Sequence, residues 1–213
     1  MDFVKRLVQL DVDSTFIQQE AIELLAVKAG VLDQVAAITE SAMRGELDFE
    51  QSLRTRVGLL KGLSESAITA VQNEIRLTNG AHDLVDNLHA KGHSVALVSG
   101  GFIDIIKPMI ESLSIRYYKA NTLEIVDSVL TGELVGPIID RAAKGAALLE
   151  FAKVCGVDIK NTVAIGDGAN DLDMMGLAGL SIAFNAKPIV VQAADFAINE
   201  PSLSSVVELI GLA

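Results

Sequence analysis

The stretch Leu7-Val-Gln-Leu-Asp-Val-Asp-Ser-Thr15 decides the fold of this 213-residue chain. Its largely apolar beginning suits a strand that is buried on both faces, as the strands of parallel sheets are. The strand ends in two carboxylates, Asp11 and Asp13. In open α/β sheets the active crevice lies beyond the carboxyl ends of the strands, so we expect Asp11 there. Such carboxylates serve as nucleophiles, ligands of hard metal ions or proton carriers, although an Asp-x-Asp pair by itself is also typical of a solvated turn or helix cap.

Composition indicates a soluble protein with an ordinary core. Half of the residues are hydrophobic, which suffices for a core without disulfides or a structural metal. The single cysteine, Cys155, has no partner for an internal disulfide and indicates a buried thiol in a reducing compartment. Asp11 interrupts the apolar run that follows Lys5 and Arg6 before a secretion signal is formed. We therefore expect a cytoplasmic protein.

The charge balance restricts the partners. The net charge is −11, whereas a nucleic acid or an anionic membrane calls for a basic face. No stretch free of Asp, Glu, Lys and Arg reaches the roughly 18 residues that a membrane helix needs. We therefore expect neither a nucleic-acid nor a membrane partner, and a monomer or homodimer that acts on a small molecule. An anionic substrate is compatible with this charge, because a few local cations set the sign of a pocket when distant charges are screened.

Residues 14–78 show helical periodicity and no convincing strand. Apolar residues recur at helical intervals, and glycines separate one periodic run from the next. The pattern predicts a small helical cap that is inserted after the first strand. We therefore divide the chain into an α/β core of residues 1–13 and 79–213 and a helical cap of residues 14–78.

From residue 80 onward, predicted helices and strands alternate. This alternation indicates parallel βαβ units, and hence an α/β fold with a doubly wound, mainly parallel sheet. Residues 123–139 are the exception, because two β-prone runs flank Asp127-Ser128 and predict a β-hairpin flap on the sheet edge. We predict helices over 80–90, 102–112, 142–154, 171–178 and 202–212 and strands over 94–99, 117–120, 162–166 and 180–184.

Three further segments carry residues that suit phosphoryl transfer. Ser99-Gly-Gly101 places a hydroxyl and flexible amides at a helix start, where N–H groups attract anions. Lys144-Gly145 opens another helix, where a lysine opposes the dipole preference and would be useful as a phosphate-binding cation. Gly166-Asp-Gly-Ala-Asn-Asp171 follows a strand-like run with oxygen donors that suit Mg²⁺. Each pattern alone also fits an ordinary turn, cap or solvated side chain, but the three complement Asp11.

In this order, the motifs resemble those of the haloacid dehalogenase superfamily of aspartate-nucleophile phosphatases, and the match spans the chain. The finer features are similar to those of the phosphoserine phosphatase branch. These features are Asp11-Val-Asp-Ser-Thr15, Glu20, Met43, Phe49, Ser52-Leu-Arg-Thr-Arg56-Val, Ser99-Gly-Gly-Phe102, Ala143-Lys-Gly145 and Gly166-Asp-Gly-Ala-Asn-Asp171. The resemblance implies a Rossmann-like core with a small helical cap. Thr78-Asn-Gly80 departs from the Thr-Pro-Gly of many relatives but still makes a turn. Because the first motif begins at residue 11, we expect the standalone form without an amino-acid-binding regulatory module.

The resemblance implies Mg²⁺-dependent hydrolysis of O-phospho-L-serine to L-serine and phosphate, the last step of serine biosynthesis. Asp11 would attack phosphorus to form an aspartyl-phosphate, and Asp13 would protonate the leaving oxygen and later activate water. Mg²⁺ would be bound by the Asp11 carboxylate, the Asp13 backbone carbonyl and Asp167, and would reduce the repulsion between nucleophile and phosphate.

The remaining roles implied by the resemblance concern the phosphate. Ser99, the Gly100 amide and Lys144 would hold the transferring oxygens. Asn170 and Asp171 would orient the phosphate, the metal-bound waters and the lysine.

The cap would select the substrate. The resemblance assigns Glu20 to the ammonium and Arg56 to the carboxylate of phosphoserine, which suits an acid and a planar guanidinium. Met43 and Phe49 would shield the closed pocket from water, although their spacing is also that of ordinary core residues.

Three kinds of function stay open at this point: a related small-molecule phosphatase of the same superfamily, a mutase or phosphotransferase, and a receiver-like signalling domain. A phosphotransferase that passes the phosphoryl group from phosphoserine to homoserine would use the same residues, since acceptor choice depends on what reaches the aspartyl-phosphate. A receiver-like signalling domain also carries a phosphorylated Asp on a parallel sheet. The long insertion between Asp11 and Ser99, and a second carboxylate at Asp13, count against this more remote reading.

Overall fold

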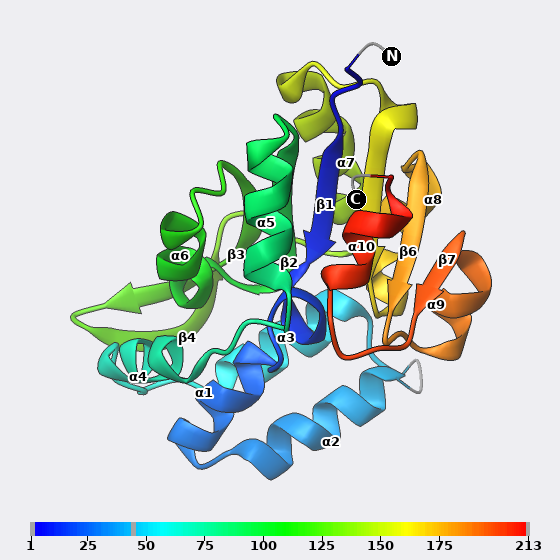
Figure 1. Ribbon diagram of the computed structural model, residues 1–213. Coiled ribbons are helices and arrows are strands. Elements are labelled where there is room, and N and C mark those ends of the chain that lie inside the picture. The colour runs from blue at the N-terminus through cyan, green and yellow to red at the C-terminus, as the bar shows by residue number, and fades with distance from the viewer. Residues whose placement is uncertain (1–2, 44–45, 212–213) are drawn as a thin grey trace.

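The computed structural model describes residues 3–43 and 46–211, apart from the side chain of Met43. Within these ranges the chain forms a seven-stranded sheet in the order β4-β3-β2-β1-β5-β6-β7 (Figure 1). Neighbouring strands pair in parallel, except that β3 and β4 are antiparallel. The strands are β1 (Leu7–Asp11), β2 (Ser94–Phe102), β3 (Tyr117–Val126), β4 (Val129–Val135), β5 (Thr162–Gly166), β6 (Leu180–Phe184) and β7 (Phe196–Ile198). The predicted α/β class and mainly parallel sheet are confirmed.

Helices cover both faces of the sheet. One face is covered by α5 (Ala81–Ala90), α6 (Ile103–Ser112) and α10 (Ser204–Leu209), and the other by α7 (Arg141–Cys155), α8 (Leu172–Leu177) and α9 (Pro188–Ala193). Strand β1 serves both layers, because Val8 and Leu10 join the first core cluster and Leu7 joins the second. This explains why the strand is apolar almost throughout, since each fully buried Val or Leu contributes about 1.5–3 kcal/mol. No helix in the described ranges is long and apolar enough to cross a membrane.

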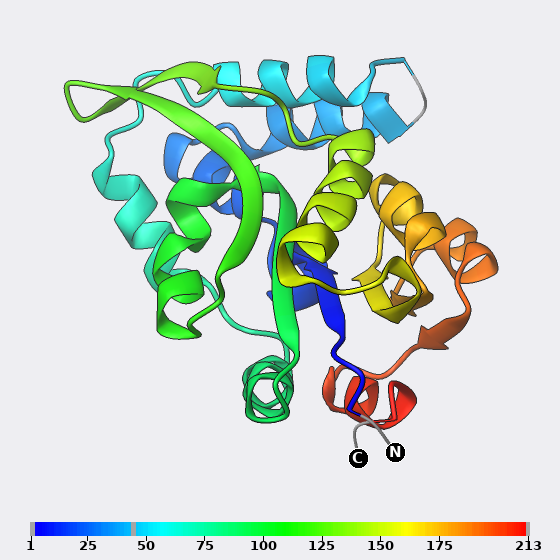
Figure 2. The same ribbon diagram turned by 90° about the horizontal axis from the view of Figure 1, so that it is seen from above.

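Of the helices between β1 and β2, the first four lie near the carboxyl end of β1 (Figures 1 and 2). They are α1 (Ala21–Ala29), α2 (Leu32–Met43), α3 (Phe49–Gly58) and α4 (Ser66–Glu74). Gly30 ends α1 in the left-handed conformation, with a φ of 71°, and Asp48 caps α3 in a capping box with Gln51. Helices therefore occupy the stretch that the sequence assigns to a cap, while the division at residues 14–78 stays a prediction.

A tight turn joins the sheet to these helices. Residues Val12–Phe16 form a single π-type turn in which Ser14 adopts a φ of 58°. Ile17 then pairs with Leu77 in an isolated antiparallel bridge, so the chain enters and leaves the helical segment at the same place. The turn holds Asp13 just beyond the end of β1.

Several element boundaries differ from the prediction. Strand β2 runs on through the glycines to Phe102, past the predicted end at residue 99. The predicted short strand at 117–120 continues into the first arm of the hairpin as one strand, β3, and Asp127 and Ser128 make the predicted turn with φ values of 51° and 59°. Helix α9 and strand β7 were not predicted, because both are short and β7 is largely exposed at the sheet edge.

Candidate active site

Asp11 ends the central strand β1 and is 4% exposed. Lys144, in the first turn of α7, is fully buried, and its Nζ donates to Asp11 Oδ1 and, over 2.7 Å, to Asp171 Oδ1. Burial disfavours the ammonium, but attraction by the two carboxylates outweighs burial and raises the pKa of Lys144. Lys144 is therefore a permanently charged cation fixed at the end of the sheet.

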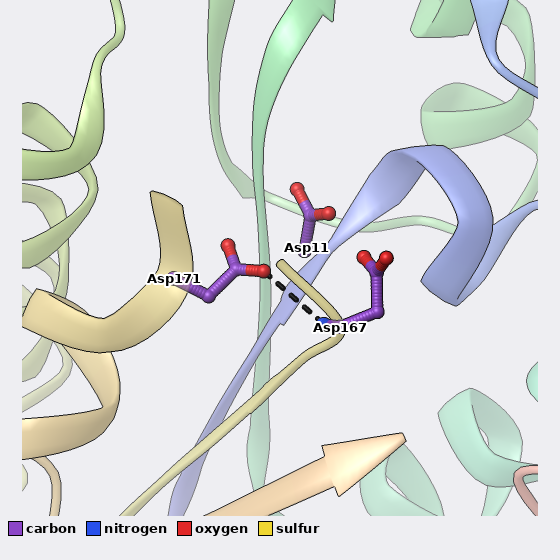
Figure 3. Close-up of side chains that lie close together, drawn as sticks. All are labelled: Asp11, Asp167 and Asp171. Carbon is purple, nitrogen blue, oxygen red and sulfur yellow. Dashed lines mark hydrogen bonds between the residues drawn. The ribbon is translucent and has the colours of Figure 1, made fainter. Parts of the chain in front are cut away.

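Three carboxylates meet at this point: Asp11, Asp167 and Asp171 (Figure 3). Each offers one oxygen within 4.8 Å of the others. Burial, followed by repulsion from Asp171, raises the pKa of both Asp11 and Asp167. A divalent cation relieves such repulsion, and carboxylate oxygens are the donors that hard cations prefer. The residues present therefore fit a divalent metal ion.

The oxygens of the cluster are not equally free. Asp171 Oδ2 accepts hydrogen bonds from the backbone N–H groups of Asp167, at 3.2 Å, and Gly168, at 3.0 Å, while its Oδ1 binds Lys144 (Figure 3). Asp11 and Asp167 each keep one oxygen, Oδ2, without a hydrogen-bond donor among the described residues. Both oxygens of Asp171 are thus already hydrogen-bonded, to Lys144 and to the loop that begins at Asp167. Asp11 and Asp167 are therefore the better metal ligands.

Gly166 and Gly168 make this loop possible. A Cβ atom at Gly166 would lie 2.4 Å from Asp171 Oδ2, and one at Gly168 would lie 2.2 Å from Asn170 Oδ1. Asp171 is fully buried and held by three hydrogen bonds, so it has no room to move away. The need for Gly166 thus has a steric cause, whereas the close atom at Gly168 is the end of a side chain that can turn aside.

Asp13 lies against the Ser99-Gly-Gly101 loop. Ser99 Oγ donates to Asp13 Oδ2 at 2.8 Å and accepts from the Gly101 N–H at 2.7 Å. The other carboxylate oxygen, Oδ1, accepts from the backbone N–H of Ala21, the first residue of α1, at 2.8 Å. One carboxylate therefore joins the end of β2 to the start of α1.

Asn121 is a site residue that sequence reasoning missed. Its buried amide donates to the Gly100 carbonyl at 2.8 Å and accepts from the Ile139 N–H at 2.8 Å. These bonds tie the Ser99-Gly-Gly101 loop to β3 and to the segment that leads into α7. The only sequence signal is a polar side chain within a β-prone run.

The site opens into a cavity of about 260 Å³ between the sheet and the helical segment. Its lining consists of Asp11, Asp13, Glu20, Ile22, Glu23, Thr39, Phe49, Leu53, Arg56, Gly100, Gly101, Phe102, Asp167, Gly168, Asn170 and Lys187. Of the predicted site residues, Ser99, Lys144 and Asp171 lie buried behind this lining, and the side chain of Met43 lies outside the described residues. The lining residues Glu23, Thr39 and Lys187 are not among the predicted site residues.

Glu20, which immediately precedes α1, and Arg56, on α3, line the same cavity as Asp11. Burial, followed by repulsion from Asp13, raises the pKa of Glu20 to about 7, and Ser14 Oγ donates to its carboxylate at 2.6 Å. Arg56 is half-buried, and burial lowers its pKa without removing its charge. Its Nε donates to the Ser52 carbonyl at 3.2 Å, and Nη1 lies 3.5 Å from Thr39 Oγ1. An acid and a guanidinium thus share a cavity with the buried carboxylate cluster.

A family model for haloacid dehalogenase-like hydrolases matches residues 8–176. The chain belongs to this family. The matched span contains all four motifs of this hydrolase, from Asp11 to Asp171.

Several relatives of this hydrolase are phosphoserine phosphatases. The enzyme from Streptomyces coelicolor is 54% identical over 98% of this chain, and the chain spans 51% of that protein's length, about half of it. The enzyme from Streptococcus thermophilus is 48% identical, with 99% of this chain and 98% of that protein covered. A solved substrate-bound phosphoserine phosphatase complex is similar with a TM-score of 0.92 and 41% identity, and the match covers 98% of this chain and 99% of that chain.

Proposed function

We propose that this hydrolase is a phosphoserine phosphatase, which converts O-phospho-L-serine to L-serine and phosphate through an aspartyl-phosphate on Asp11. The observation that carries the proposal is the shared cavity, in which Glu20 and Arg56 face the end of β1 that bears Asp11. Phosphoserine has three charged groups, and this part of the protein offers Glu20 for the ammonium, Arg56 for the carboxylate and the end of β1 for the phosphate. Full-length similarity to the Streptococcus thermophilus enzyme supports the same assignment.

The chain's own residues suit a two-step displacement. Asp11 attacks phosphorus while Asp13 gives a proton to the departing seryl oxygen, and Asp13 then takes a proton from the water that hydrolyses the aspartyl-phosphate. The hydrogen bonds of Asp13 to Ser99 and to the Ala21 N–H fix its carboxylate beside the loop that would receive the phosphate. The positions of both carboxylates therefore agree with these roles.

Phosphate binding is assigned to Lys144, Ser99 and the Gly100 amide. Lys144 is held by Asp11 and Asp171, so its charge is in place before the phosphate arrives. Asn170 lines the cavity and would orient the phosphate and its surroundings.

We propose that the metal ion is Mg²⁺, bound by the carboxylates of Asp11 and Asp167 and by the backbone carbonyl of Asp13. The unpaired oxygens of Asp11 and Asp167, and the burial and repulsion from Asp171 that raise their pKa values, support this choice. When bound, the ion would neutralise charge on the nucleophile and on the phosphate.

Substrate selection is assigned to the helical cap of residues 14–78. Glu20 would bind the ammonium and Arg56 the carboxylate, while Met43 and Phe49 would exclude water. Phe49 supports its part of this assignment, because it lines the cavity next to Gly100. We further propose a cytoplasmic monomer or homodimer that needs no nucleic acid or membrane, in keeping with the net charge of −11.

Phosphate release from a panel of phosphomonoesters in the presence of Mg²⁺ tests the proposal. We expect O-phospho-L-serine to be preferred over esters that lack an ammonium or a carboxylate. The same assay with homoserine added separates hydrolysis from phosphotransfer: unchanged phosphate release supports the phosphatase, and accumulation of phosphohomoserine shows a transferase. Membership of a hydrolase family disfavours the receiver-like signalling domain.

A further inference from the structure

A second cavity, of about 420 Å³, lies at the end of the sheet opposite Asp11. Its lining comes from segments that lead into β1, β2 and β3 and includes Lys5, His93 and Arg116, whereas Asp11 and Ser99 lie toward the other ends of their strands (Figure 1). Along an extended strand, the six steps from Lys5 to Asp11 span about 20 Å. This basal cavity is therefore separate from the catalytic pocket.

The basal cavity is basic within an acidic protein. The chain has 28 Asp and Glu against 17 Lys and Arg, yet the described lining contains Lys5, His89, His93 and Arg116 and no carboxylate. Two of the chain's three histidines lie here. Such a local reversal of charge favours an anionic occupant.

His93 supplies a buried donor without an acceptor. The residue is 6% exposed, and its Nδ1 accepts a hydrogen bond from the Arg6 N–H at 3.0 Å. Burial, followed by the nearby charges of Arg6 and Lys91, lowers the pKa of His93 and favours the neutral ring, whose proton must then lie on Nε2. That Nε2 atom has no hydrogen-bond partner among the described residues. An unmet buried donor destabilises the folded protein, so the group needs an explanation.

Helix ends explain only part of this arrangement. Helices α5, α6 and α7 end nearby, and cations close to their C-termini are stabilised by the helix dipoles. Lys5 fits this explanation, because its Nζ donates to the carbonyl of Cys155 at 3.1 Å. Arg116 follows the end of α6 by four residues, so a helix end lies near it as well, but it forms no ion pair with a described carboxylate. Helix ends do not explain the Nε2–H of His93.

We propose that the basal cavity binds a small oxyanion, a phosphate or a carboxylate, through the Nε2–H of His93, the guanidinium of Arg116 and the ammonium of Lys5. A guanidinium offers a planar pair of donors to either group, and the ammonium adds charge. The anion would give the buried imidazole N–H the acceptor that the protein does not supply. This site goes beyond the proposed phosphatase activity and does not depend on it.

Nuclear magnetic resonance of the histidine rings tests the site directly. The chain has only three histidines, so His82→Gln and His89→Gln variants assign the ring signals of the ¹⁵N-labelled protein. Inorganic phosphate is titrated at constant ionic strength with chelator present, and acetate and chloride are titrated separately. We expect a saturable shift of the His93 Nε2 signal with phosphate, acetate or both, and none with chloride. Equal, non-saturating shifts with all three salts would overturn the proposal.

Variants distinguish specific binding in the basal cavity from a general effect of lost surface charge. Arg116→Gln removes an exposed side chain and should weaken binding of the preferred oxyanion roughly tenfold or more, whereas Lys107→Gln, an exposed charge loss on α6, should not. His93→Asn keeps an acceptor for the Arg6 N–H but removes the Nε2–H, and the His89 signal then reports binding. We expect the His93→Asn affinity to fall by a similar factor. Equal affinities in the parent, Arg116→Gln and Lys107→Gln proteins would contradict the proposed site. The circular dichroism spectrum of His93→Asn must match that of the parent for its affinity to be compared.

Discussion

Replacing Arg56 with Ala should damage hydrolysis of phosphoserine and spare that of a phosphate ester without an amino-acid end. The core side of α3 is formed by Leu53 and Val57, both buried, so removing the guanidinium leaves the packing of the helix intact. The Arg56 side chain bonds within the protein only to the Ser52 carbonyl and, weakly, to Thr39, and the rest of the guanidinium is available to the cavity. The Arg56→Ala variant therefore loses one charge-assisted contact to the substrate carboxylate.

Such a contact contributes about 1.5–3 kcal/mol, which corresponds to a loss of roughly ten- to more than a hundredfold in kcat/KM. The assay is phosphate release from O-phospho-L-serine and from ethyl phosphate, measured on the same preparations. Arg54→Ala is the matched control, because Arg54 lies on the same helix, is exposed and pairs with Glu50 outside the cavity. We expect Arg54→Ala to resemble the parent with both substrates.

Glu20→Ala should repeat the pattern of Arg56→Ala, since the carboxylate is assigned to the ammonium of the same substrate. If both folded variants lost activity equally on phosphoserine and ethyl phosphate, the reasoning would be refuted. That result would mean that Glu20 and Arg56 support the structure of the cavity and do not recognise the substrate.

The other predictions concern the catalytic groups and the metal. Asp11→Asn should abolish both turnover and the acid-stable labelling of the enzyme by phosphate, because an amide is no nucleophile at phosphorus; label on a different residue would reject the role of Asp11. Asp13→Asn should lower turnover of phosphoserine by roughly 10² to 10⁴ but affect an aryl phosphate much less, because that leaving group needs no proton, and equal losses would argue against proton transfer. Because the pKa of Glu20 is raised to about 7, its carboxylate becomes protonated as the pH falls below 7, so kcat/KM for phosphoserine should decline there relative to ethyl phosphate; a decline that persists in Glu20→Gln would disprove this cause. Excess chelator should abolish activity and Mg²⁺ should restore it, whereas full activity in chelator would exclude the metal assignment.

Residues at strand ends could be predicted because parallel strands bring their carboxyl ends to one edge of the sheet. Asp11 and the Asp167 loop illustrate this, since β1 and β5 are neighbours in register, with Leu10 opposite Ile165. Ser99 lies near the same edge on β2, one residue past Val98, which pairs with Asp11, although β2 itself continues to Phe102. Spacing and residue type therefore sufficed for these positions.

Residues whose roles depend on distant partners could not be predicted in this way. Asn121 reaches the Gly100 carbonyl and the Ile139 N–H, two groups that no local pattern connects. Lys187 enters the cavity because its N–H binds the Asp167 carbonyl ahead of the short helix α9, which itself gave no clear periodic signal. The continuation of β3 into the flap likewise depends on tertiary pairing with β4.

The most direct test of the central claim is the ratio of kcat/KM for O-phospho-L-serine to that for ethyl phosphate, measured with Mg²⁺ on the unmodified chain. Ethyl phosphate lacks the carboxylate and the ammonium, so it cannot make the contacts to Arg56 and Glu20. At roughly 1.5 kcal/mol or more for each contact, the two together predict a preference of at least about a hundredfold for phosphoserine. A ratio near one would contradict the account, because the cavity that contains Glu20 and Arg56 would then recognise nothing beyond the phosphate.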